Sequence, residues 1–230
     1  MATSTKYWDK IADKYSKRPI ADETSYQKKL QVTQEYFKPD MEVLEFGCGT
    51  GSTAITHASH VKQIRAIDIS SEMIEIAQGK AEAQGIENIT FEQLTIEKLE
   101  VEDSTYDAVL GLSILHLLEN KESAIAKVYQ MLKPGGIFVT STMCMGDTMG
   151  WFKLIAPIGK ALGFFPLVRV FSAQDLIKSL TDAGFARQPV ARVRCGQALS
   201  RVEGTVEGEI EYRWQPSKDK ATFIVAKKPE

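Results

Sequence analysis

The chain has 230 residues, of which 43% are hydrophobic and 25% charged, and its formal net charge is −2 at pH 7. This composition excludes a disordered or low-complexity chain and is typical of a globular domain with one sizeable core. Acidic and basic residues are interspersed, without the basic stripe that nucleic-acid binders carry. We therefore expect a small-molecule partner and no nucleic acid.

The cysteines and the N-terminal residues bear on the compartment. Cys48, Cys144 and Cys195 are too widely spaced for a disulfide framework or a metal-ligand set, which is typical of a reducing compartment without a bound metal. Residues 1–10 are polar and lack the apolar run of a signal peptide. No segment reaches the roughly 18 consecutive apolar residues that a transmembrane helix needs. We expect a cytoplasmic protein without stable membrane insertion, and the sequence leaves a monomer and a homodimer equally open.

Residues 1–40 are expected to form a helical cap. Thr24 followed by Gln27 is typical of a capping box at the start of the second helix. Within the first helix, aromatic and aliphatic residues recur at helical spacing: Tyr7, Trp8, Ile11 and Tyr15. This stripe predicts packing against the core, and the alternative is that Tyr15 covers a reaction site.

From residue 41 onward, strands alternate with helices. Buried strands are expected at 41–46, 63–69, 88–93, 106–112 and 137–142. Helices are expected at 52–60, 71–84 and 120–132. This alternation indicates an α/β fold whose mostly parallel sheet is doubly wound, with helices on both faces and right-handed crossovers. Residues 41–142 are then the cofactor-binding core of a single domain that spans residues 1–230.

Residues 143–171 break the alternation, because they are rich in apolar residues and are interrupted by prolines. We expect a helical insertion after the fifth strand. It would form either a lid over an apolar acceptor pocket or an interface or membrane-surface helix, since large exposed apolar patches mark such surfaces. The small number of basic residues in this segment favours the lid.

Residues 172–230 are expected to complete the sheet. Ser172 and Asp175 predict a capping box for a helix that ends at Gly184. The clearest remaining strand is 222–227, whereas the pattern does not settle how the strands between 187 and 214 divide.

A glycine-rich loop, Glu45-Phe46-Gly47-Cys48-Gly49-Thr50-Gly51, follows the first strand and opens a helix. Glycines there allow the backbone to approach a ligand closely, and open α/β sheets bind ligands at this edge. Asp68 ends the second strand, 21 residues after Gly47, where its carboxylate can accept hydrogen bonds from ribose hydroxyls. Together these features predict a site for a nucleoside-containing cofactor.

The glycine spacing narrows the choice of nucleoside. The dinucleotide fingerprint needs its third glycine at the position of Ser52, whereas here it falls at Gly51. A phosphate-binding loop of the Gly-Lys-Ser/Thr type is absent. A nicotinamide-dependent oxidoreductase is therefore the less favoured alternative.

Three motifs carry a family resemblance: Val43 to Gly51, the acid Asp68, and Lys133-Pro134-Gly135-Gly136 before a strand. The phrase Ser71-Glu72-Met73-Ile74 after the acid adds a fourth. From about residue 7 to 228 the sequence resembles the class I S-adenosylmethionine-dependent methyltransferases. Within them it is most similar to the small-molecule branch that includes ubiquinone and menaquinone C-methyltransferases. The resemblance implies a seven-stranded Rossmann-like methyltransferase fold and methyl transfer from S-adenosylmethionine, with S-adenosylhomocysteine as product.

The resemblance also implies which residues contact the cofactor. The methionine part would lie along backbone atoms of the loop, and the ribose and adenine along the ends of the next strands. The implied residues are Gly47, Cys48 and Gly49 for the methionine part, Glu45 for its ammonium group through water, Asp68 for the ribose, Ile69 and Met73 for the adenine, and Leu112 beside the cofactor.

One position departs from the family's pattern. An acid after the third strand often receives the adenine amino group there, and the next residue's backbone amide meets the ring. The matching positions are Thr95 and Ile96. Because a hydroxyl bonds more weakly than a carboxylate, we expect a weaker contact with the adenine amino group at Thr95.

The chemistry needs few groups, because a sulfonium is already an activated methyl donor. In-line positioning alone can contribute about 7–11 kcal/mol to lowering the barrier, and a general base matters only where the acceptor loses a proton. His116, after the fourth strand, is the candidate base, and the alternative is that it orders a loop. His57 and His60 are expected to be structural. We expect transfer to a small, apolar or aromatic acceptor, and a protein that binds S-adenosylmethionine without methyl transfer is the main alternative.

Overall fold

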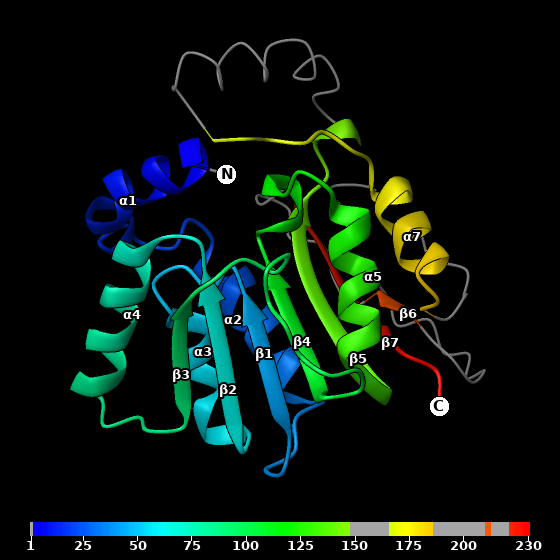
Figure 1. Ribbon diagram of the computed structural model, residues 1–230, viewed down its shortest axis with the longest axis horizontal. Coiled ribbons are helices and arrows are strands. Elements are labelled where there is room, and N and C mark those ends of the chain that lie inside the picture. Colours follow the sequence, from blue (N-terminus) through cyan, green and yellow to red (C-terminus); the bar gives the residue numbers. More distant parts are fainter. Residues whose placement is uncertain (1, 148–165, 186–209, 213–220) are drawn as a thin grey trace.

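The computed structural model describes residues 2–147, 166–185, 210–212 and 221–230 (Figure 1). Within them, seven strands form one sheet in the order β3-β2-β1-β4-β5-β7-β6. The strands are β1 (Glu42–Phe46), β2 (Gln63–Asp68), β3 (Ile89–Gln93), β4 (Tyr106–Leu112), β5 (Leu132–Met143), β6 (Ile210–Tyr212) and β7 (Ala221–Lys227). The strands β1 to β5 pair in parallel, and β7 runs antiparallel to both of its neighbours. The predicted mostly parallel α/β sheet is confirmed.

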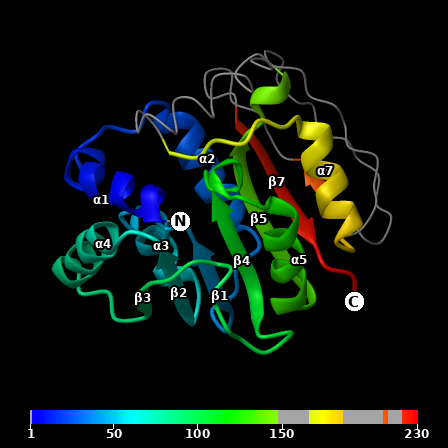
Figure 2. The ribbon, with the colours of Figure 1, turned by 45° about the horizontal axis from the view of Figure 1, so that its top comes forward.

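Helices cover both faces of this sheet (Figures 1 and 2). They are α1 (Ala2–Ser16), α2 (Glu23–Gln34), α3 (Ser52–His57), α4 (Ser71–Ala83), α5 (Lys121–Met131) and α7 (Ala173–Asp182), with short 3₁₀ helices η1 (Ala58–His60), η2 (Leu115–Leu117) and η3 (Met145–Asp147). One core cluster joins the sheet to α5 and α7, and a second joins it to α2, α3 and α4. The helix α1 packs beside α4 (Figure 2).

Serine side chains cap two of the helices, and one of these caps is the predicted capping box. The hydroxyl of Ser70 accepts a hydrogen bond from the backbone N–H of Met73 and so caps α4. Ser172 and Asp175 form the predicted capping box of α7. Such caps satisfy N–H groups that have no partner inside the helix.

The predicted capping box at Thr24 and Gln27 is wrong. The N-cap of α2 is Asp22, whose carboxylate accepts a hydrogen bond from the backbone N–H of Ser25 at 3.0 Å. Gln27 instead donates to the carboxylate of Glu23 at 2.7 Å. Aspartate is a strong N-cap, and its charge is favourable beside the helix N-terminus, so the helix begins earlier than the Thr24 pattern suggests.

The boundary between α5 and β5 also differs from the expectation. The helix ends at Met131 and the strand begins at Leu132, whereas the sequence predicted a helix to 132 and a strand only from 137. Pro134 disfavours helical backbone at the residue before it, and Gly135 adopts φ +74°. The chain therefore extends at once, with a register irregularity where β5 first pairs with β4.

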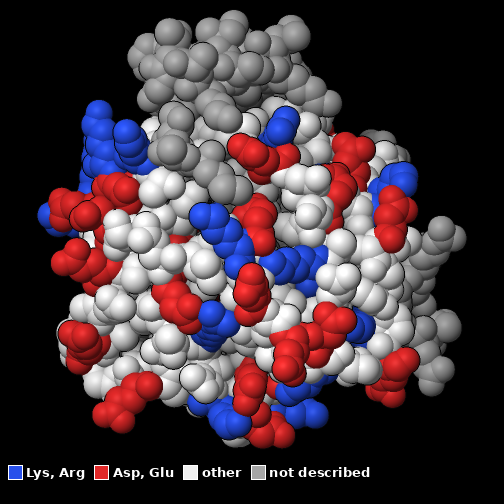
Figure 3. All heavy atoms as spheres, viewed as in Figure 1, with Lys and Arg blue, Asp and Glu red and all other residues white. Residues whose placement is uncertain are grey.

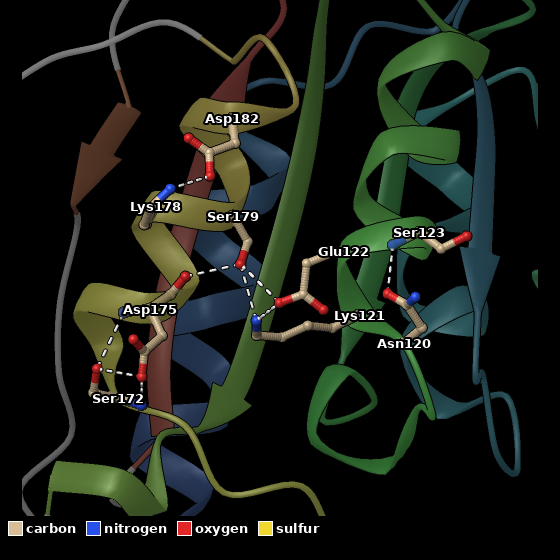
Figure 4. Close-up of polar contacts among 9 residues, drawn as sticks. All are labelled: Asn120, Lys121, Glu122, Ser123, Ser172, Asp175, Lys178, Ser179 and Asp182. Atoms are coloured by element: carbon tan, nitrogen blue, oxygen red, sulfur yellow. Dashed lines mark hydrogen bonds and ion pairs between the residues drawn. The ribbon is translucent and has the colours of Figure 1, made fainter.

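Polar contacts hold α7 against α5 (Figure 4). The ammonium group of Lys121 donates to the Ser179 hydroxyl at 2.9 Å and contacts the Glu122 carboxylate. It also lies 5.0 Å from the centre of the Phe171 ring. Lys121 is only 9% exposed, and these partners compensate for the burial of its charge.

The expected insertion at 143–171 is described only at its two ends, because residues 148–165 lie outside the described residues. These ends meet. The backbone N–H of Gly146 donates to the carbonyl of Phe171 at 2.9 Å, and that of Ala173 to the Asp147 carboxylate at 2.9 Å. The described residues on the two sides of 148–165 are thus bonded to each other beside the carboxyl end of β5. Among the described residues, no helix combines the length and the apolar character that crossing a membrane requires.

Packing of the sheet on its first core cluster can be tested at Gly111 in β4. A Cβ atom there would lie 2.5 Å from Cζ of Phe46 and 3.2 Å from Cε2 of Phe138, and both rings are buried. We expect Gly111→Ala to lower the free energy of unfolding by about 1–3 kcal/mol, the usual cost of overpacking.

Gly79 on α4 provides the matched control. It is exposed, and a Cβ atom there would meet nothing within 4 Å. Gly79→Ala should therefore raise the free energy of unfolding by about 0.5–1 kcal/mol, because alanine loses less entropy in a helix. Urea denaturation measures both variants. A Gly111→Ala protein as stable as the wild type would contradict the tight packing at this strand.

Candidate functional site

The loop between β1 and α3 contains three glycines in the left-handed region. Gly47, Gly49 and Gly51 adopt φ values of +67°, +53° and +72°. A Cβ atom at Gly47 would lie 2.6 Å from Ile114, and one at Gly51 would lie 2.8 Å from Ala77. At Gly49, by contrast, a Cβ atom would meet nothing within 4 Å. Packing therefore requires two of the glycines, and the third leaves its backbone facing open space.

Asp68, at the end of β2, is bonded directly to this loop. Its Oδ2 atom accepts a hydrogen bond from the backbone N–H of Gly49 at 2.9 Å, and its Oδ1 atom accepts one from Ser70 at 2.9 Å. Burial raises the pKa of Asp68, although these N–H donors act in the opposite direction. Each carboxylate oxygen can still accept a further hydrogen bond, so the predicted acid is placed to receive hydroxyl groups.

A cleft lies in front of the loop and Asp68. Five of the predicted cofactor residues line it: Gly47, Asp68, Ile69, Thr95 and Ile96. The other lining residues are Ser4, Trp8, Phe46, Leu94, Glu97, Ile114, Leu117, Leu118, Glu119 and Leu167.

Most of these additional residues carry no motif that could have identified them. Trp8 belongs to the helical stripe that the sequence analysis noted, and an apolar run after β4 supplies Ile114, Leu117 and Leu118. Leu167 comes from the short described segment that precedes α7. Their positions at the cleft follow from tertiary structure alone.

The other predicted cofactor residues lie around the cleft without lining it. Met73 on α4 is buried, and Leu112 at the end of β4 packs against the second core cluster. Cys48 and Gly49 belong to the loop itself, and the Cys48 side chain packs into the same cluster. The assignments of these residues to the cofactor stay predictions, as do those of the residues that line the cleft.

Glu45 is a buried carboxyl group at the end of β1. It is 3% exposed, and its Oε2 atom has no hydrogen-bond partner among the described residues. Burial, together with the charge of Asp68, raises the pKa of Glu45 to about 8. A buried carboxyl group without a partner is costly, so this position is suited to a cationic or hydrogen-bonding group of a ligand.

Thr95 follows β3, where the family often has an acid. Its Oγ1 atom is buried without a hydrogen-bond partner in the described part of the chain. Its carbonyl oxygen accepts hydrogen bonds from the backbone N–H groups of Lys98 and Leu99. Thr95 therefore shapes the turn at this edge of the cleft.

His116, the candidate base, lies in η2 and is 8% exposed. Its Nδ1 atom is 3.0 Å from the Thr142 hydroxyl, and its carbonyl accepts a hydrogen bond from the N–H of Arg169 at 2.7 Å. Burial lowers the pKa of His116 to about 4, and the residue does not line the cleft. These contacts favour the alternative that His116 orders the neighbouring segment. His57 is fully buried and packs edge-on against Phe37, which is consistent with a structural role.

The helix α1 closes one side of the cleft. Its Asp9 carboxylate accepts a hydrogen bond from the Ser70 hydroxyl at 2.6 Å, which ties α1 to the residue that also donates to Asp68. Trp8, the neighbour of Asp9, lines the cleft. Burial and the charge of Asp68 raise the pKa of Tyr15, so the Tyr15 phenol lies in the electrostatic field of the same acid.

The family described as Methyltransferase domain matches residues 37–213. The chain belongs to this family. The match covers the strand, loop and acid that build the cleft, and it confirms the resemblance to methyltransferases. Trp8 and Asp9 lie before the matched residues.

Curated relatives carry methyltransferase names. The methyltransferase YcgJ of Bacillus subtilis strain 168 is 30% identical over 110 residues, which cover 48% of this chain and 44% of that protein. The ubiquinone biosynthesis O-methyltransferase of Rickettsia canadensis is 35% identical over 103 residues, 45% of this chain and 43% of that protein. The matched part thus spans less than half the length of these relatives.

Solved structures share the fold. The crystal structure of Bacillus subtilis YcgJ has a TM-score of 0.62 at 22% identity and covers 70% of this chain and 69% of that one. The crystal structure of a methyltransferase of Thermotoga maritima has a TM-score of 0.63 at 20% identity and covers 97% of this chain and 99% of that one. At these identities the likeness establishes the fold, which is the predicted methyltransferase fold.

The raised pKa of Glu45 predicts a pH dependence of stability. Its folded-state pKa of about 8 lies above the ordinary value of 4.5, so the folded protein binds the proton more tightly than the unfolded chain. The stability that this tighter proton binding contributes is fully present below pH 4.5 and is lost as the pH rises through 8. The free energy of unfolding falls by up to about 1.4 kcal/mol for each pH unit. Glu45→Gln removes this dependence, since the amide cannot ionise.

Urea denaturation of the wild type and Glu45→Gln at several pH values between 5 and 9 measures the effect. The stability of the variant relative to the wild type should increase with pH. Glu75→Gln on the exposed side of α4 is the matched control and should show no such trend. Parallel stability curves for the wild type and Glu45→Gln would show that Glu45 does not hold its proton in the folded state.

Proposed function

We propose that the protein transfers a methyl group from S-adenosylmethionine to a small, apolar or aromatic acceptor by in-line displacement. The observation that carries the proposal is the joined pair of Asp68 and the glycine loop at the mouth of the cleft. The Asp68 carboxylate and the open backbone at Gly49 meet within one hydrogen bond of 2.9 Å. Membership of the methyltransferase domain family supports the same conclusion.

The residues at the cleft fit this cofactor. Asp68 would receive the ribose hydroxyls, and the backbone of Gly47 and Gly49 would accommodate the methionine part, because a side chain at Gly49 would fill that space. The Oε2 atom of Glu45, which has no hydrogen-bond partner among the described residues, would interact with the ammonium group. When bound, S-adenosylmethionine supplies a methyl group that is already activated by the sulfonium.

The walls of the cleft favour an apolar acceptor. Trp8, Leu117, Leu118 and Leu167 present hydrophobic side chains to it. On the face shown in Figure 3, acidic and basic side chains of the described residues are interspersed, so this face does not favour a polyanionic partner. An apolar small molecule fits this site better than a polyanion such as a nucleic acid. The name of the Rickettsia relatives, ubiquinone biosynthesis O-methyltransferase, is consistent with this class of acceptor.

The protein's own contribution would be positioning and exclusion of water rather than proton transfer. His116, the predicted candidate base, has a pKa of about 4 and lies outside the cleft lining. Orientation of two reactants can account for a barrier reduction of about 7–11 kcal/mol. The proposal therefore favours an acceptor whose nucleophilic atom needs no strong base.

Cofactor binding separates the proposal from a nicotinamide-dependent oxidoreductase. Isothermal titration calorimetry with S-adenosylhomocysteine and with NAD should show binding of the first and not of the second. Tight binding of NAD without a response to S-adenosylhomocysteine would overturn the proposal.

The glycine loop allows a matched pair of variants in the same titration. Gly49 and Gly85 both have positive φ values, and at both a Cβ atom would meet nothing within 4 Å. Alanine should cost each position about 1–2 kcal/mol of stability, the penalty for left-handed backbone. Only Gly49→Ala should also weaken S-adenosylhomocysteine binding, by about tenfold or more. Equal affinities in the two variants would place the cofactor elsewhere.

The acceptor class is tested by methyl transfer to a panel of aromatic and prenylated compounds and of polar amines. We expect transfer to the apolar compounds. Leu167→Ala should lower this transfer, whereas Val168→Ala, the neighbouring residue outside the cleft lining, should not. Transfer to polar amines alone would contradict the acceptor class, and binding of the cofactor without transfer to any compound would favour a binding protein.

A further inference from the structure

Lys80, on α4, reaches the outer side of the glycine loop. Its Nζ atom lies 2.9 Å from the Thr50 hydroxyl, 3.3 Å from the Thr50 carbonyl oxygen and 3.4 Å from the Ser52 hydroxyl. An ammonium group has three donors, and three oxygen atoms of the loop surround it.

This use of a lysine is unusual because its partners are neutral. Among the described residues Lys80 makes no ion pair, whereas Lys62, the residue before β2, pairs with the Glu42 carboxylate at 2.7 Å. Burial also lowers the pKa of Lys80. The charge of Lys80 is thus held against the loop backbone instead of against an acid.

The loop is in close contact with α4 at the same place. A Cβ atom at Gly51 would lie 2.8 Å from Ala77, which precedes Lys80 by nearly one helical turn, and 2.9 Å from Phe91. On the other side of the loop, the N–H of Gly49 donates to Asp68. Two adjacent residues of the loop therefore have different partners. Gly49 is bonded to Asp68, which lines the cleft, and Thr50 is bonded to Lys80 on α4.

We propose that Lys80 is a positioning residue for the cofactor. By holding Thr50 against α4, it keeps the backbone at Gly49 in the left-handed conformation that directs its N–H to Asp68. Without Lys80 the loop can relax, and the carboxylate and the backbone that would bind the cofactor lose their alignment. This inference rests on the proposed function, because it concerns the same cofactor.

Lys80→Met tests it, because methionine keeps the aliphatic stem and removes the donors. We expect S-adenosylhomocysteine to bind Lys80→Met about tenfold more weakly than the wild type, the equivalent of about 1.4 kcal/mol. Lys80→Arg, which keeps a cationic donor, should restore most of the affinity. Lys62→Met is the control for loss of a surface lysine and should bind as the wild type does.

A double-mutant cycle separates positioning from a general effect of charge. Thr50→Val removes the hydroxyl that Lys80 contacts, so the loss caused by Lys80→Met should be smaller in the Thr50→Val background. If Lys80→Met does not fold, Thr50→Val alone must weaken binding, and unchanged affinity would overturn the inference. Wild-type affinity in a folded Lys80→Met protein, or fully additive losses, would overturn it while leaving the proposed function intact. A wild-type protein that binds no S-adenosylhomocysteine would overturn both.

Discussion

The hydrogen bond from the Gly49 N–H to the Asp68 carboxylate is the contact on which the site depends. It exists because β1 and β2 pair in parallel with Phe46 opposite Ile67, which brings the residues after both strands to the same edge of the sheet. A shift of the register by one residue would turn Asp68 toward the opposite face. The buried cores on both faces of the sheet prevent such a shift, so the apolar packing of the strands fixes the geometry of a polar site.

Burial also determines the charge state of this site. Glu45 and Asp68 are both buried at the ends of neighbouring strands. Besides burial, the charge of Asp68 raises the pKa of Glu45, and both carboxylates raise the pKa of the Cys48 thiol. In the described part of the chain, Lys80 on α4 bonds the loop rather than either carboxyl group. The resulting pair of carboxyls without a cation is costly in isolation, and a cationic ligand would reduce that cost. The electrostatics therefore favour a cofactor that carries an ammonium and a sulfonium.

The sequence predicted those parts of the fold and site that depend on local pattern. The strand at 106–112 matches β4 because a nearly all-apolar run is bounded by polar residues, and the predicted capping box of Ser172 and Asp175 forms because its two partners lie only three residues apart. Asp22 was missed because the Thr24–Gln27 spacing fits the capping-box pattern, whereas the N-cap of α2 lies two residues earlier. Trp8, Leu167 and Lys80 were missed for a different reason. They reach the cleft or the loop from distant segments, and only tertiary structure brings them there.

The residues that local pattern predicted and those that only tertiary structure reveals lie on different sides of the cleft. The proposed cofactor side consists of the ends of β1 and β2 with their loops, within the residues that match the methyltransferase family. The remaining walls come from α1, which lies before that match, and from the described segment 166–171. Asp9 ties α1 to Ser70, and the carbonyl of His116 ties that segment to the end of β4. Under the proposed function, the core would hold the cofactor while these two walls would set the acceptor, so the choice of acceptor would depend on residues that no cofactor motif contains.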